Sequence, residues 1–328
     1  MPRRLRALLA ALLMVAGTAA CAGSRAGAPG AGASGGAGEE PAAGAGGPDA
    51  AAGGAGSKKD DPLFPASKAG WAHADRATRE RAAALAADYL PFLDRARTPR
   101  RAIAALVELY RAAGAVPLEG GLPAGGRAYW IAPGGDAALL LLAGRGGAAA
   151  GIRAAVAAVD GPRIDLKQVP LYRHDRLAML ETSLYGDITL ESWLVRPLAL
   201  HVRVARPGAP ARELVVGEAP GDPVLMIPDL LIHLSGKVQA RAPVDTAERM
   251  DAIAAQSSRA LTAALRAAGI APADLATAEA YLVPAERAVL AGVDGAMVAG
   301  YAQSVLAPAW AATRALAAAE PGEASAAV

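Results

Sequence analysis

The sequence predicts an α/β fold that carries an inserted β-rich domain. Two observations lead to this prediction. Helical patterns over residues 74–114 are followed by apolar strand-like runs up to residue 159, which indicates a core built of both helices and strands. Over residues 168–238, short apolar runs follow one another with turn residues between them, which is typical of a compact antiparallel sheet. We therefore expect residues 71–166 and 243–328 to form the α/β domain and residues 167–242 to form the insert.

Two helices are expected at the start of the α/β domain. Residues 74–93 place Leu85, Tyr89 and Phe92 on one face of the first helix. The second helix opens at Pro99, a residue favoured in the first turn, with Thr98 as its N-cap, and runs to residue 114. Its inward face is predicted to consist of four apolar residues, Ile103, Leu106, Val107 and Tyr110.

Strands are expected next. Residues 127–131 and 137–142 flank a turn, and the second run is apolar throughout, as a strand buried on both faces should be. Residues 156–159 are predicted to form another short buried strand.

After the insert the pattern returns to longer elements. Residues 246–268 have the spacing of a long amphipathic helix, which Gly269 ends. Residues 278–283 are strand-like, the chain returns to helix from residue 308, and residues 324–328 are predicted to begin a strand.

The first 21 residues resemble a lipoprotein signal peptide. Arg3, Arg4 and Arg6 form a basic stretch, residues 7–17 are apolar, and small residues precede Cys21. Cys21 is the single cysteine of the chain and lies where such signals are lipidated. The alternative is an ordinary secretory signal in which this cysteine occurs by chance. We favour a membrane anchor through lipid on Cys21, because several acyl chains together give stable anchoring.

Residues 22–70 are expected to form a disordered tether, since they are dominated by Ala, Gly, Pro and Ser. Residue 22 is Ala rather than Asp, so retention at the inner membrane is not signalled. The expected location is the cell envelope, as an outer-membrane lipoprotein that faces the periplasm. Charge is close to balanced, with 33 Lys and Arg against 31 Asp and Glu, so no nucleic-acid partner is expected.

Short local motifs do not identify a catalytic or cofactor-binding site on their own. Residues 144–149 match Gly-x-Gly-x-x-Ala, but without a following crossover helix this pattern is better interpreted as a surface turn than as a dinucleotide site. No nucleophile elbow, phosphate-binding loop or His-Glu-x-x-His helix is present in the sequence. The four histidines, His73, His174, His201 and His233, show no ligand spacing, and each is interpreted as a surface or satisfied core residue.

The segment Ala157-Ala-Val-Asp-Gly-Pro-Arg-Ile-Asp-Leu-Lys167 is the most informative part of the chain. It resembles the Ala-His-x-Asp-Ser-Pro-Arg-x-Asp-Leu-Lys-Pro signature of the aspartyl-aminopeptidase (aminopeptidase I) family. Further segments resemble that family in the same order, roughly over residues 75–328, and they include 97–99, 196–201, 217–218, 227–233, 279–284 and 300–303.

The resemblance implies a dinuclear zinc aminopeptidase that assembles as a large homo-oligomer and removes acidic or neutral N-terminal residues. In such an enzyme two zinc ions polarise the scissile carbonyl and generate a hydroxide nucleophile. The first histidine ligand of the family falls on Ala158, and the bridging aspartate falls on Val305, with Ser304 before it. Asp160 is retained, in the role of a residue that orients a ligand without binding the metal itself. The catalytic glutamate pair and the last two ligands are expected after residue 328, so the chain is interpreted as a degenerate and truncated member.

Three hypotheses follow. The first is a lipid-anchored, aminopeptidase-like module that has lost zinc-dependent hydrolysis, needs no cofactor, and binds a peptide or protein or assembles into a homo-oligomer through the β insert. The second is an active metalloaminopeptidase with two zinc ions. The third is a truncated, non-functional gene product. Two ligand losses that both precede the chain end favour the first hypothesis.

Overall fold

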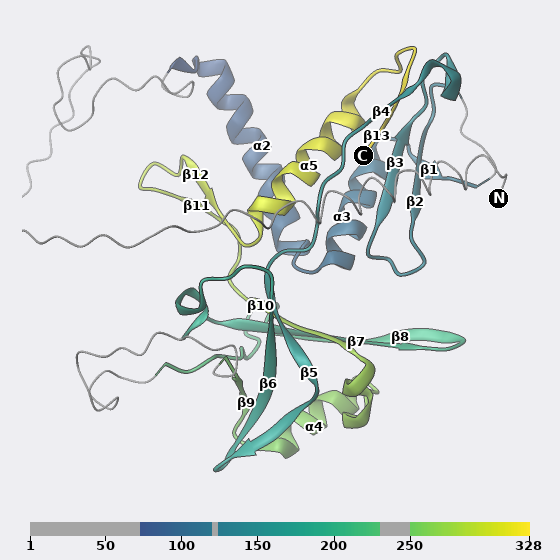
Figure 1. Cartoon of the computed structure of the whole chain (residues 1–328). Helices are drawn as coiled ribbons and strands as arrows, with labels where there is room; N and C mark the ends of the chain where they lie inside the picture. Colours follow the sequence, from purple (N-terminus) through teal and green to yellow (C-terminus); the bar gives the residue numbers. More distant parts are fainter. Residues whose placement is uncertain (1–72, 120–123, 230–249) are drawn as a thin grey trace, which may run out of the picture. The chain divides into compact units, whose positions relative to one another are not determined.

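The computed structural model describes residues 73–119, 124–229 and 250–328. The chain divides into two compact units, Met1–Ala82 and Ala83–Val328, and the architecture below is that of the second unit (Figure 1). The predicted signal peptide with Cys21, the predicted tether 22–70 and His233 lie outside the described residues. In the three described ranges, no helix is both long and apolar enough to cross a bilayer.

A five-stranded mixed sheet forms the first part of the unit (Figure 1). Its strands, in spatial order, are β1 (Val116–Pro117), β2 (Arg127–Ile131), β3 (Ala138–Leu142), β13 (Ser325–Ala327) and β4 (Ile152–Ala154). Strand β13 pairs antiparallel with β3 and parallel with β4. The end of the described chain therefore lies inside this sheet rather than at its edge.

Three helices bury apolar side chains beside this sheet: α2 (Arg76–Arg95), α3 (Pro99–Ala112) and α5 (Gln303–Ala318). Tyr110 of α3 is fully buried and packs with Leu140 and Leu142 of β3. A second cluster joins the three helices around Trp310, whose ring centroid lies 5.0 Å from that of Tyr89. The three aromatic rings of this cluster, Tyr89, Phe92 and Trp310, bury a large apolar surface.

A six-stranded antiparallel sheet forms the second part. Its strands, in spatial order, are β8 (Ala209–Val216), β7 (Leu198–Arg206), β10 (Glu279–Pro284), β5 (Arg163–His174), β6 (Leu177–Tyr185) and β9 (Ala252–Ala255). One face, which includes Ile164, Leu200 and Leu282, is fully buried in a cluster with α4 (Ser258–Ala267) and the 3₁₀ helix η6 (Pro272–Thr277). Because side chains alternate along a strand, the other face carries polar residues such as His201 and Glu279.

Three smaller elements complete the unit. They are the 3₁₀ helices η3 (Gly147–Ala150) and η4 (Leu190–Trp193), and the hairpin of β11 (Val289–Ala291) and β12 (Met297–Ala299). Residues 144–149 thus lie in a turn and the short η3 helix, as the sequence predicts.

Much of the predicted pattern is confirmed. The mixed α/β class with a β-rich part is as predicted, β2 has the expected bounds, and α3 begins at Pro99 with its four predicted inward residues buried. Thr98 occupies the N-cap position, although its side chain makes no capping hydrogen bond. The predicted domain boundary at residue 242 remains a prediction, but β9 and β10 follow that residue and still belong to the six-stranded sheet.

Three predictions of local structure are wrong. Residues 156–159 form no strand, and Val156 is exposed, because β4 ends at Ala154 and the chain then leaves the sheet. The described part of the predicted helix 246–268 begins as β9, which pairs with β6, and becomes helical only at Ser258 after the N-cap Ser257. Leu85 is 45% exposed although it shares its spacing with the buried Tyr89. For β9 the short apolar pattern fits both a strand and a helix, and pairing with the distant strand β6 decides between them.

Candidate functional site

The loop between β4 and β5 contacts the chain just ahead of α5. The Tyr301 hydroxyl donates a hydrogen bond of 2.6 Å to the carbonyl oxygen of Pro162. A Cβ atom on Gly161 would lie 2.5 Å from the Cβ of Ala302, so only glycine fits at this position. The two segments in which ligand losses are predicted are therefore neighbours in space.

Ala158 and Asp160 both lie in this loop, and both are exposed. The Tyr185 hydroxyl donates a hydrogen bond of 2.5 Å to Oδ2 of Asp160. This bond, followed by burial, raises the pKa of Tyr185. Asp160 thus has a phenol as its partner. It lies two residues after Ala158 and is the nearest acidic residue to Ala158 in the sequence.

Val305 lies in the first turn of α5 and is half-buried. It packs at the edge of the three-helix cluster, as do Ala157 and Val159 of the β4–β5 loop. The position where the family resemblance implies a bridging carboxylate therefore contributes an apolar side chain to the core. Neither the methyl group of Ala158 nor the isopropyl group of Val305 has a lone pair to offer a metal.

The described residues do not supply a zinc site. Zinc in proteins is bound by Cys, His, Asp or Glu side chains, usually four donors in a structural site and three in a catalytic site. Among residues 73–119, 124–229 and 250–328, no three such side chains are grouped so that they could hold a metal ion. The donor set present around Ala158 and Val305 therefore does not fit the zinc pair that the resemblance implies.

Ala302, at the N-cap of α5, has a left-handed backbone with φ of 56°. Glycine adopts this conformation freely, whereas for an L-residue it costs about 1–2 kcal/mol. The strain falls on the segment that contacts Gly161.

Arg163 anchors the other end of the loop. Its guanidinium lies 3.7 Å from the ring centroid of Tyr185 and 4.5 Å from that of Tyr281. It also donates a hydrogen bond of 2.7 Å to Asp165. Burial raises the pKa of Asp165, against the opposing effect of Arg163. The loop that carries Asp160 is thus held by cation–π and ionic contacts at its base.

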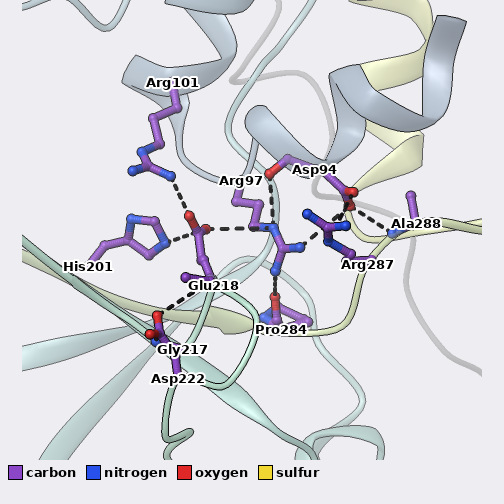
Figure 2. A network of polar contacts seen from close by, with 11 residues as sticks. Asp94, Arg97, Arg101, His201, Gly217, Glu218, Asp222, Pro284, Arg287 and Ala288 are labelled. Carbon is purple, nitrogen blue, oxygen red and sulfur yellow. Dashed lines mark hydrogen bonds and ion pairs between the residues drawn. The ribbon is translucent and has the colours of Figure 1, made fainter.

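A buried polar network lies between the turn ahead of α3 and the six-stranded sheet (Figure 2). Arg97 is 5% exposed and donates 2.7 Å from Nη1 to the carbonyl oxygen of Pro284. Glu218 contacts Arg101 at 2.5 Å and His201 at 2.9 Å. Burial alone would raise the pKa of Glu218, but His201 and Arg101 outweigh it and hold that pKa at about 2. The largely buried carboxylate of Glu218 thus stays ionised.

Sequence reasoning anticipates the environment of the histidines but not the buried ion pairs of this network. His201 is buried and bonded to Glu218, while His73 and His174 are exposed, so each of the three falls under the predicted alternatives of a surface or a satisfied core residue. The pairing of Arg97 and Glu218 was missed. Both residues occur in segments that resemble the family, which is a usable signal, but neither spacing nor residue type indicates that they meet.

Comparisons of the sequence with a family profile and with curated proteins point to the same family. Residues 92–326 match the sequence profile of the aminopeptidase I zinc metalloprotease (M18) family. The chain is 28% identical over 263 residues to a "Probable M18 family aminopeptidase 1" of Clostridium acetobutylicum, covering 74% of this chain and 56% of that protein. It is also 28% identical over 256 residues to the protein of the same name from Thermotoga maritima, with the same two coverages.

The structure agrees with solved structures of these proteins. The crystal structure of the M18 aminopeptidase of Thermotoga maritima superposes with a TM-score of 0.70 at 28% identity, covering 79% of this chain and 59% of that one. Aminopeptidase I of Borrelia burgdorferi gives a TM-score of 0.67 at 19% identity, which shows a shared fold. The chain spans just over half the length of the two curated relatives.

Proposed function

Because the chain belongs to the aminopeptidase I zinc metalloprotease (M18) family, we propose that it keeps the fold of an aminopeptidase and has lost hydrolysis by the two-zinc mechanism. The observation that carries this proposal is the pair Ala158 and Val305, one an exposed methyl and the other part of an apolar cluster. The chain then acts as a binding or assembly module rather than as a peptidase.

The retained architecture supports a binding role. The close approach of Gly161 to Ala302, the Tyr301 contact to Pro162 and the Arg163 contacts hold the β4–β5 loop against the rest of the fold. An extended loop beside a packed helix is a surface on which a peptide or a partner protein can bind. The membrane anchor on Cys21, a periplasm-facing location and a homo-oligomer formed through the β insert belong to the same proposal.

Metal content and activity test the proposal directly. The purified chain is expected to contain no stoichiometric zinc after dialysis against micromolar zinc, and to leave aspartyl and glutamyl anilides unhydrolysed. Stoichiometric zinc together with turnover of either anilide would instead identify an active metalloaminopeptidase. A chain that aggregates without a cooperative melt would point to a non-functional gene product.

A double variant serves as the matched control. Ala158→His with Val305→Asp restores the two ligand types that the family resemblance implies at these positions. It is expected to bind zinc about tenfold or more tightly than the unchanged chain, since imidazole and carboxylate are both zinc ligands. Equal zinc affinity in both proteins would show that these residues do not occupy former metal positions.

A further inference from the structure

Strand β4 is an unprotected edge of the five-stranded sheet. The two larger sheets end at β1 and β4 and at β8 and β9. Pro117 in β1 and Pro210 in β8 have no N–H to offer a further strand, and β9 already carries a bridge from Ile253 to Met226. Strand β4 contains no proline, and no described strand pairs with its outer side. It therefore lacks the devices by which the other three edges are closed to a further strand.

The backbone of β4 determines which kind of partner fits this edge. The carbonyl oxygen of Gly151 and the N–H of Ala155 form hydrogen bonds with β13, of 3.0 and 2.9 Å. Successive residues of a strand direct their N–H and C=O groups to opposite sides, so those of Ile152 and Ala154 point away from β13 toward the free edge. Such a row of donors and acceptors is matched by the backbone of another extended polypeptide.

The side chains along this edge leave room for such a strand. Ala154 and Ala155 are exposed and small, and Val156 is 68% exposed. Neighbouring strands lie about 4.8 Å apart, a spacing that these side chains do not obstruct. Arg153 carries the single charge of residues 152–159. The edge is therefore apolar apart from one cation.

Arg153 indicates the chemistry of the partner. It is exposed and forms no ion pair among the described residues. It is also the middle residue of β4, so two copies paired antiparallel about a two-fold axis through this strand would place their arginines side by side. Like charges on neighbouring strands are destabilising, whereas an acidic side chain opposite Arg153 is favourable. The charge thus favours an acidic segment of another protein over a second copy of this chain.

We propose that the edge of β4 binds an extended segment of another protein, which adds a strand to the five-stranded sheet. The outward N–H and C=O groups of Ile152 and Ala154 form hydrogen bonds with the backbone of that segment, and Arg153 pairs with an acidic side chain of it. This inference rests on the binding role proposed above and names the class of partner.

Fluorescence anisotropy with the full chain and a labelled heptapeptide tests the proposal. The probe is blocked at both ends and consists of alternating threonine and valine with one central glutamate. It is expected to saturate one site per chain, and a probe with lysine in place of glutamate should bind roughly two- to fivefold more weakly. No saturable binding of the glutamate probe would overturn the proposal.

The same preparation distinguishes this inference from the loss of hydrolysis. An aminopeptidase acts on a free N-terminus, so the blocked probe is not its substrate. Turnover of an aspartyl or glutamyl anilide beside saturable probe binding would refute the loss of hydrolysis alone. An inactive chain that does not bind the probe would refute the edge inference alone.

Ala154→Pro removes the N–H that faces the free edge and no hydrogen bond to β13, so it should melt like the unchanged chain. It is expected to bind the glutamate probe about tenfold more weakly. Arg153→Glu is a second variant in case the first one folds poorly, and it should reverse the preference between the glutamate and lysine probes. Arg259→Glu, at an exposed position of α4, is the matched control and should leave both affinities unchanged.

Two results would overturn the proposal at this stage. One is probe binding that both β4 variants leave unaltered, or that Arg259→Glu alters equally. The other is a dimer of the unchanged chain that Ala154→Pro converts to a monomer in size-exclusion chromatography, because a second copy would then occupy the edge.

Discussion

Nε of Arg97 lies 3.6 Å from Oε1 of Glu218, and both side chains are largely buried. This contact joins the turn between α2 and α3 to the segment that follows β8 (Figure 2). The helical clusters and the core of the six-stranded sheet are thereby connected through charge as well as through chain continuity. Glu218 is the centre of the network, since it also binds Arg101 and His201.

Replacement Glu218→Gln should destabilise the protein by about 3 kcal/mol, because removing one member of a buried ion pair leaves the others uncompensated. Urea unfolding followed by circular dichroism measures the effect. Glu108→Gln is the matched control: its pair with Arg95 is 2.9 Å long but exposed on both sides, so a loss below about 1 kcal/mol is expected. Equal losses of unfolding free energy for the two variants would show that the buried network stabilises the protein no more than an exposed ion pair does.

Stability should fall in acid through Glu218. Its pKa in the folded protein is about 2, against an ordinary value of 4.5, so the unfolded chain binds this proton more readily. The stabilisation is complete above pH 4.5 and is lost as the pH falls from 4.5 toward 2. Melting temperatures of the unchanged chain and of Glu218→Gln, recorded across this range, should converge at the acid end. Parallel curves would contradict the assignment.

Gly161→Ala should cost about 1–3 kcal/mol, since the new methyl would meet the Cβ of Ala302 at 2.5 Å and force the loop away from α5. The comparison is Gly322→Ala, where the nearest atom to the added Cβ is 4.0 Å away and little change is expected. Chemical denaturation of both variants gives the difference. If Gly161→Ala proved as stable as Gly322→Ala, the close approach of the loop to Ala302 would be wrong.

Ala302→Gly should stabilise the protein by about 1 kcal/mol, because glycine removes the strain of the left-handed backbone at φ of 56°. The same substitution at Ala311, an exposed position inside α5, should have the opposite sign and cost about 1 kcal/mol. Melting temperatures of the two single variants are sufficient. A loss of stability at both positions would mean that Ala302 is not strained.

The sequence predicts helix α3 well and strand β9 poorly. Pro99 and the 3.6-residue spacing of Ile103, Val107 and Tyr110 are local signals, so α3 could be predicted almost residue by residue. By contrast, β9 could not be recognised, because its strand character depends on pairing with β6 far away in sequence. The Ala158 and Val305 positions follow from the family resemblance, whereas the contact between Arg97 and Glu218 depends on side chains that only the fold brings together.

The position of β10 has a consequence for how the chain folds. This strand lies between β7 and β5, yet it follows both of them, and β8 and β6, in the sequence. During synthesis the hairpins β5–β6 and β7–β8 are therefore made before β10. The edges of β5 and β7 that pair with β10 stay unpaired until residue 284 has been made. Pairings of such long sequence separation are slow, and open edges invite association with other chains. The interval before β10 is made is thus the stage at which the edges of β5 and β7 are open to pairing with other chains.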